Sequence, residues 1–339
     1  MYLRKNNPLT TVAAAAGMLV LIFDSKTAVA GAADGIRLCV QTLIPSLFPF
    51  FLLSILLTNS LFGQPIPLVR SVTRLCGIPI GSESLLAVGF LGGYPTGAQS
   101  VAQMYRSGKL TGLQARKMLP LCNNAGPAFI FGVLGCMFSK KYAVWILWLV
   151  HILSALGAAA ILPATDGSAT LNSSKTVRIT DALEQALRVT ALVCGWVVLM
   201  RIVVAFLDRW FLWMLPQSLQ ITVAGILELS NGCIRLGEIP QEGLRFLIAG
   251  GLLSLGGLCV TLQTASVADG LGLQSYFPGK ILQCCISMMM CCLLQPLFPE
   301  QHQFSAVAPL FLTAAAISIV ITVILRHKNS SGIMAVHGV

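Results

Sequence analysis

Long apolar runs recur from one end of the chain to the other, with short polar stretches between them. They cover residues 8–23, 42–61, 142–162, 183–207, 244–266, 280–297 and 306–325. Most are about 18 to 25 residues long, which suffices to cross ~30 Å of hydrocarbon as an α-helix. The pattern predicts an all-α polytopic membrane protein with about eight transmembrane helices and two further segments that form re-entrant or broken hairpins.

The first half of the chain contains two helix breaks inside segments that are otherwise apolar, GGYPTGA at 92–98 and NNAGP at 123–127. We expect the breaks to be formed by Gly92, Gly93, Pro95, Gly97, Gly126 and Pro127. Irregular backbone at membrane depth is tolerated only inside protein or beside a wet cavity, so the breaks predict a binding site. The polar side chains that we expect to bind a solute there are Tyr94, Thr96, Gln99, Asn123 and Asn124.

The segment at 83–105 is expected to be a re-entrant hairpin that bends at GGYPTGA and returns to the side from which it entered. With hairpins in both halves, more arginines and lysines lie on the cytoplasmic side than with straight crossings. Arg106 and Gly108 predict the C-terminal end of the hairpin, and Thr111 with Gln114 predicts a capping box for the next helix. The proline of NNAGP is expected at the first position of a half-helix.

The second half repeats the order of the first. A stretch at 164–180 that is rich in Ser, Thr, Ala and Gly predicts a linker. A helix, a short segment broken at LSNG, a glycine-studded segment and a last pair of helices follow it. Two copies that enter from opposite sides are the inverted repeats of secondary transporters. We expect a single membrane domain over 1–339, with one repeat at 36–163, the other at 181–327, and Gln263 of the second half also in the solute site.

Glu228 is the acidic residue placed within a break at membrane depth. An intramembrane carboxylate is a candidate for coupling to a proton or sodium ion, and the alternative is an interfacial residue paired with Arg235. Arg201 is expected to snorkel to the outer interface. Cys122 stands before the asparagine pair and could serve a passing metal ion as a soft ligand, but one thiol does not make a metal site.

Composition supports a membrane protein and excludes several other classes. The chain is 56% hydrophobic and only 10% charged, and its mean hydropathy is +0.82. The net charge of +10 is spread over short loops, which indicates control of topology and not a nucleic-acid site. The 11 cysteines show no metal-ligand spacing and the four histidines are dispersed. We therefore expect no metal site, no cofactor and no enzymatic activity.

The N-terminal region sets the expected orientation. Arg4 and Lys5 precede the first apolar run and predict a cytoplasmic N-terminus. Arg326 and Lys328 follow the last run and predict a cytoplasmic C-terminus. Ala28 to Ala30 also resemble a signal-peptidase site. Residues 24–41 carry two aspartates, a lysine and an arginine, and we expect them to lie along the outer interface.

The motifs together resemble the nucleoside-recognition, or Gate-domain, family, and within it the YlbJ-like sporulation branch. The resemblance rests on IPSLFPFFLLS at 44–54, GGYPTGA, GKLTGLQARKM at 108–118, NNAGPAFIFG at 123–132 and, more loosely, GGLCVTLQTAS at 256–266. It extends over roughly residues 8–330, and ELSNGC from Glu228 departs from the family pattern. It implies a multi-pass protein of the bacterial cytoplasmic membrane that is connected with building the spore and its cortex.

These observations favour a transporter-like protein that binds or moves a small polar solute, nucleoside-like or other, across the membrane. A non-transporting scaffold for spore assembly and a channel similar to metal-ion permeases are the alternatives. The expected partners are membrane lipid, an unidentified small solute, and either a second copy of the chain or other sporulation proteins. Nucleic acid is not expected.

Overall fold

The computed structural model describes residues 8–61, 66–165, 178–268, 270–294 and 297–298, and every regular element in these ranges is helical. Five described helical segments are long and apolar enough to cross a membrane: Ser25–Leu57, Lys141–Ile161, Ile179–Trp210, Glu242–Val267 and Tyr276–Leu293. The predicted helix at 306–325 and most of the predicted linker lie outside the described residues. The structure is therefore that of a multi-span helical membrane protein.

The chain begins with helices that cover one side of the molecule: α1 (Pro8–Phe23), α2 (Ser25–Leu38), the π-helix Cys39–Leu43 and α3 (Ile44–Leu61). Residues 24–41 do not form a separate element, because α2 continues through the π-helix into α3, and their place along the outer interface stays a prediction. Asp24 starts α2 by accepting a hydrogen bond from the Thr27 amide at 3.3 Å. Helix α2 packs closely on α10 through Gly31 and Gly35, which share one face of the helix. This contact holds α2 in the long helix although the segment carries charged residues.

The first broken segments follow as α4 (Pro67–Leu75), α5 (Glu83–Gly92), α6 (Thr96–Arg106), α7 (Gly112–Cys122), α8 (Pro127–Val133) and α9 (Lys141–Ile161). Gly108 lies just beyond α6 with φ +71°, as a helix C-terminus requires. The capping box is confirmed, since Thr111 N donates to Gln114 Oε1 at 2.9 Å and Gln114 N donates to Thr111 Oγ1 at 3.3 Å.

The second half contains α10 (Ile179–Trp210), α11 (Gln217–Leu227), α12 (Leu229–Arg235), α13 (Glu242–Leu255), α14 (Gly257–Val267) and α15 (Tyr276–Leu293). Glu228 separates α11 from α12. Gly256 and Gly257 separate α13 from α14, and each has φ +77°, a backbone conformation that other residues rarely adopt. Each half thus contains two consecutive interrupted segments between longer helices.

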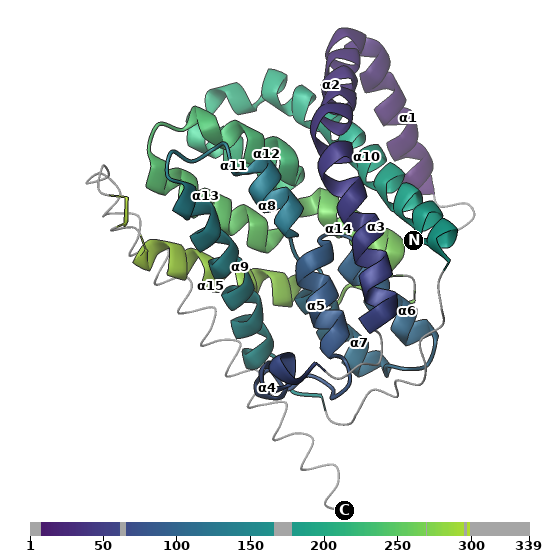
Figure 1. Ribbon diagram of the computed structural model, residues 1–339. Coiled ribbons are helices and arrows are strands. Elements are labelled where there is room, and N and C mark those ends of the chain that lie inside the picture. The colour runs from purple at the N-terminus through teal and green to yellow at the C-terminus, as the bar shows by residue number, and fades with distance from the viewer. Residues whose placement is uncertain (1–7, 62–65, 166–177, 269, 295–296, 299–339) are drawn as a thin grey trace, which may run out of the picture.

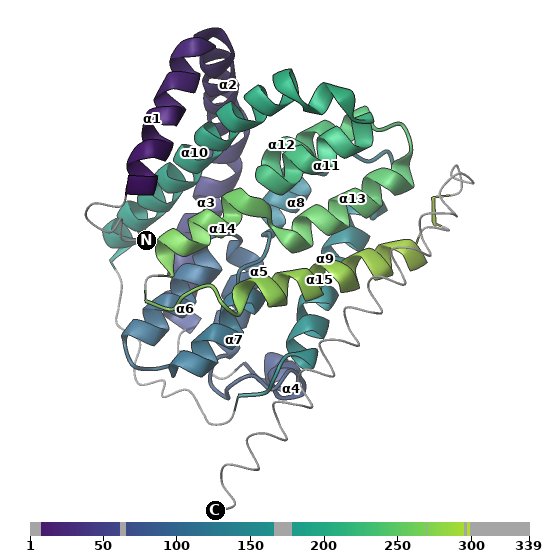
Figure 2. The same ribbon diagram turned by 180° about the vertical axis from the view of Figure 1, so that it is seen from behind.

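The helices extend between two opposite ends of the molecule (Figure 1). The connection between α1 and α2 lies at one end, α4 lies at the other, and α11 and α12 are in the same half as the α1–α2 connection. The view from behind shows the same arrangement, with α5 and α14 between the two ends (Figure 2). The re-entrant hairpins and the relation of the halves by inversion stay predictions.

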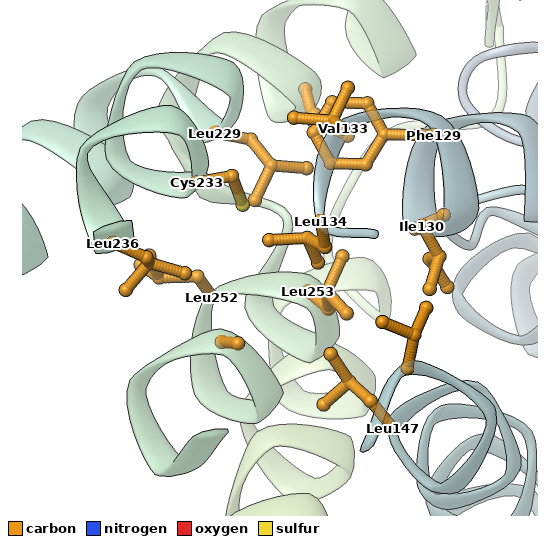
Figure 3. Packing of buried hydrophobic residues seen from close by; sticks show 14 of the residues in the cluster. Phe129, Ile130, Val133, Leu134, Leu147, Leu229, Cys233, Leu236, Leu252 and Leu253 are labelled. Carbon is orange, nitrogen blue, oxygen red and sulfur yellow. The ribbon is translucent and has the colours of Figure 1, made fainter. Parts of the chain in front are cut away.

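A hydrophobic core joins the half-helices of the two halves of the chain. Figure 3 shows Phe129 and Val133 of α8 facing Leu229 and Cys233 of α12, with Leu253 of α13 close by. All five side chains are buried. Because lipid tails are as apolar as these residues, close packing and not water exclusion holds such helices together within a membrane.

Candidate solute site at the helix breaks

The two breaks of the first half touch each other through their glycines. A Cβ on Gly93, whose φ is +75°, would lie 2.9 Å from Gly126 N. A Cβ on Gly97 would lie 1.7 Å from the carbonyl oxygen of Cys122, and one on Gly89 would lie 2.4 Å from the same oxygen. Only glycine allows these backbones to approach so closely. The GGYPTGA and NNAGP motifs therefore form one structural unit.

The breaks of the second half also touch, and Tyr94 joins the two units. A Cβ on Gly257 would lie 2.7 Å from the Ile226 carbonyl oxygen, at the end of α11. Tyr94 Oη donates to the Leu253 carbonyl at 2.8 Å and lies beside Gly256. Two chain segments 159 residues apart thus meet inside the protein.

A cavity of about 40 Å³ lies where three of the breaks converge. Its lining includes Gly92, Gly93, Tyr94, Gly126, Phe129, Glu228, Ser230, Val260 and Gln263. A cavity needs roughly 10–15 Å³ of such space for one water molecule, so this one has room for a few waters or a small solute group. The observed cavity is bordered by three of the predicted solute-binding and coupling residues, Tyr94, Gln263 and Glu228.

The asparagine pair anchors a buried hydrogen-bond network. Asn123 Nδ2 donates to Thr264 Oγ1 at 2.7 Å and to Tyr276 Oη at 2.9 Å. Asn124 Nδ2 donates to the Leu121 carbonyl at 2.5 Å, and both asparagines are completely buried. Asn123 Oδ1 has no hydrogen-bond partner among the described residues. This oxygen is the part of the network that remains able to accept a further hydrogen bond.

Lys280, the first residue of the apolar run predicted at 280–297, lies at the centre of this network. It belongs to α15 and is 1% exposed. Its Nζ donates to Asn124 Oδ1 at 3.1 Å and to Gln283 Oε1 at 2.9 Å, and it lies 5.5 Å from the centre of the Tyr94 ring. The structure shows no salt bridge between Lys280 and a described carboxylate. The ammonium is therefore held by neutral oxygens and an aromatic face.

His151 supports the second break from α9. Its Nε2 accepts a hydrogen bond from the amide of Ala125 at 3.1 Å. This bond satisfies a backbone N–H of the NNAGP turn that has no partner within a helix. Gln283 Nε2 donates to Asn124 Oδ1 at 2.9 Å and to the His151 carbonyl at 3.5 Å. His151 Nδ1 is buried without a partner among the described residues. Helices α9 and α15 thus hold the break in place by polar contacts.

Glu228 organises the break in the second half. The side chain is 2% exposed, and its two carboxylate oxygens accept from the amides of Ser230 at 2.9 Å and Asn231 at 2.6 Å. The alternative of a Glu228–Arg235 pair is wrong, because Arg235 pairs with Asp208 at 3.2 Å and with Glu238 at 3.6 Å. Glu228 is a buried N-terminal cap of α12 that also borders the central cavity.

The remaining predicted residues occupy different places. Thr96 Oγ1 donates to the Gly93 carbonyl at 2.7 Å within its own turn. Gln99 Oε1 is buried without a partner among the described residues. Gln263 borders the cavity and donates to Cys259 Sγ at 3.4 Å, so its neighbour Thr264, and not Gln263, contacts the first-half asparagines.

Within the described part of the chain, no group of three His, Cys, Asp or Glu side chains could hold a metal ion. Cys122 is completely buried against the glycines of the first break. Its backbone, rather than its sulfur, makes the contacts that matter to the site.

Sequence reasoning missed the contribution of α15. Tyr276, Lys280, Gln283 and Ser287 are spaced by four, three and four residues, so they share one face of the helix. A polar stripe in an apolar helix indicates a buried polar interface, and this spacing could have identified it. His151, a lone histidine between apolar residues, carried no comparable signal.

Part of the chain is similar to the sporulation integral membrane protein YlbJ of Bacillus subtilis (strain 168). The two sequences are 28% identical over 118 residues, which is 33% of this chain and 28% of that protein. No protein-family model matches the chain, and no solved structure matches it. The relationship is thus distant and partial, and it links this multi-span helical protein to a membrane protein of sporulation.

Proposed function

We propose that this chain is a transporter-like protein of the bacterial cytoplasmic membrane that binds or moves a small polar solute during spore formation, where it serves the cortex. The observation that carries the proposal is the cavity enclosed by three helix breaks beside the buried Lys280 network. In secondary transporters, substrate sites form between discontinuous helices near the midplane. The similarity to a sporulation membrane protein supports the process.

Each part of the site has a role in this proposal. The cavity receives a polar group of the solute between Tyr94, Glu228 and Gln263. Lys280 places an ionisable amine next to the breaks, and ionisable groups within membranes are expensive and usually functional. The contacts at Gly93, Gly126 and Gly257 hold the broken segments closely against one another. A kinked helix that serves packing alone would need neither a buried lysine nor a cavity.

The test is solute accumulation in vesicles that contain the purified full chain, with a panel of nucleosides, amino acids, sugars and small organic acids. We expect one class to accumulate with wild-type protein and not with Lys280→Met. The matched control is Lys141→Met, which removes a lysine from the exposed start of α9. If no class moves, or if Lys280→Met transports like wild type and supports normal heat-resistant spores, the proposal fails.

A further inference from the structure

A second and larger cavity, of about 470 Å³, lies between α2, α10 and α12. It falls in the size range of ligand pockets, roughly 300–1,000 Å³. Three helix faces line it: Gly31, Asp34, Leu38 and Gln41 from α2 and the π-helix, Arg201, Val204, Ala205 and Asp208 from α10, and Asn231, Ile234, Arg235 and Glu238 from α12 and the turn after it. Their spacing of three and four residues means that each helix presents one continuous face to the cavity.

The glycines of α2 fix the shape of this cavity. A Cβ on Gly31 would lie 2.9 Å from Ala205 Cβ, and a Cβ on Gly35 would lie 2.9 Å from Val198 Cα. These contacts bring α2 and α10 close together along one edge. The wall is therefore held by direct backbone packing.

The cavity is lined by three arginines and three carboxylates, and the salt bridges among them leave Arg201 out. Arg235 is held by two carboxylates, Asp208 and Glu238, while Arg37 lies 4.0 Å from Asp34. Arg201 lines the same cavity and makes no salt bridge or hydrogen bond with another described residue, although Glu228 interacts with it electrostatically at longer range. The guanidinium donors of Arg201 therefore stay available to the carboxylate or phosphate oxygens of a bound group.

Asn231 is the second, independent observation. Its side chain lines the cavity and the residue is 1% exposed, yet neither Oδ1 nor Nδ2 has a hydrogen-bond partner among the described residues. A buried amide without hydrogen-bond partners is destabilising, so the Asn231 side chain is expected to hydrogen-bond a group that occupies the cavity. Its backbone amide is already held by Glu228, which keeps the side chain in place.

We infer that this cavity binds the carboxylate or phosphate group of a small anionic ligand. Arg201 would pair with the charge, and Asn231 Nδ2 would donate a hydrogen bond to the same group. A planar guanidinium matches both carboxylate and phosphate oxygens, and bonds between charged partners are the strongest of this kind. The site goes beyond the proposed transport function, because it is separate from the break cavity. Asn231 faces one cavity, while its neighbour Ser230 borders the other.

The experiment measures binding to the purified full chain, and it needs no transport assay. Delipidated protein in neutral detergent is titrated with inorganic phosphate, glutamate and citrate by calorimetry. The same protein in nanodiscs is compared with and without phosphatidylglycerol, to separate a soluble ligand from a lipid headgroup. We expect at least one probe to bind, and Arg201→Gln and Asn231→Leu to weaken it by roughly tenfold or more.

The matched control is Arg188→Gln, the same change on the same helix at an exposed residue whose partner is Glu184. It should bind the probes like wild type. Retained helicity and a single gel-filtration peak show that each variant folds. Binding to either a soluble anion or the anionic lipid that depends on Arg201 supports the inference. It is overturned if no probe binds, or if Arg201→Gln binds as tightly as wild type, whatever the vesicle assay shows.

Discussion

Gly97→Ala tests whether the breaks are as tightly packed as the structure shows. The added methyl group would lie 1.7 Å from the Cys122 carbonyl oxygen. Carbon and carbonyl oxygen normally approach no closer than about 3.3 Å, so α6 and the end of α7 must separate by about 1.5 Å. The carbonyl oxygen belongs to the backbone, so it cannot relieve the clash by a change of rotamer as a side chain could.

The cost of this separation outweighs the benefit of alanine in a helix. Overpacking of a tight interior costs about 1–3 kcal/mol, and more where the backbone must shift. The change from glycine to alanine returns at most about 1 kcal/mol of helix propensity. We therefore expect Gly97→Ala to be less stable than wild type. Because Cys122 directly precedes Asn123, the shift also moves the hydrogen bonds to Thr264 and Tyr276.

The assay is thermal unfolding of the purified protein in detergent, followed by solute accumulation in vesicles. The control is Gly195→Ala in the exposed middle of α10, where no atom lies within 4 Å of the added methyl group. We expect a clearly lower Tm and reduced transport for Gly97→Ala, and an unchanged or higher Tm for Gly195→Ala. Equal Tm values for Gly97→Ala and wild type would refute the close contact between the two breaks.

Two further substitutions test the caps that shape the site. Glu228→Gln replaces two carboxylate acceptors with one carbonyl oxygen, so one of the amides of Ser230 and Asn231 loses its partner, and we expect a loss of about 1–2 kcal/mol in the free energy of unfolding. Thr111→Ala removes the acceptor of the Gln114 amide and should cost about 1 kcal/mol, measured as a lower urea or thermal midpoint.

Each cap has a control elsewhere in the chain. Glu184→Gln alters an exposed carboxylate on α10, and Ser60→Ala removes an exposed hydroxyl that donates within its own helix to the Leu57 carbonyl. Both should leave the unfolding midpoint unchanged. A cap variant that is no less stable than its control would contradict the assigned role.

Much of the local structure followed from the sequence alone. Apolar runs of membrane-spanning length, the capping box at Thr111 and the breaks around Gly93 and Glu228 are encoded within a few residues of where they occur. Propensity, capping and the absence of an amide proton on proline act at short range, so the sequence reveals them directly. The sequence did not reveal that one helix runs through residues 24–41. Its charged residues are also typical of an interfacial segment, and the helix against which they pack is not known from the sequence.

The site itself was decided by tertiary packing. Lys280 stands near the start of an apolar run, and its position along the chain is equally typical of an interfacial lysine and of a buried one. Only the packing of α15 on α7 and α9 takes the ammonium out of solvent and gives it Asn124 and Gln283 as partners. In the same way, only the neighbouring helices pair Arg235 with Asp208 and leave Arg201 without a salt bridge among the described residues. The sequence by itself determines which groups are polar and where helices break, whereas long-range contacts decide which of those groups meet.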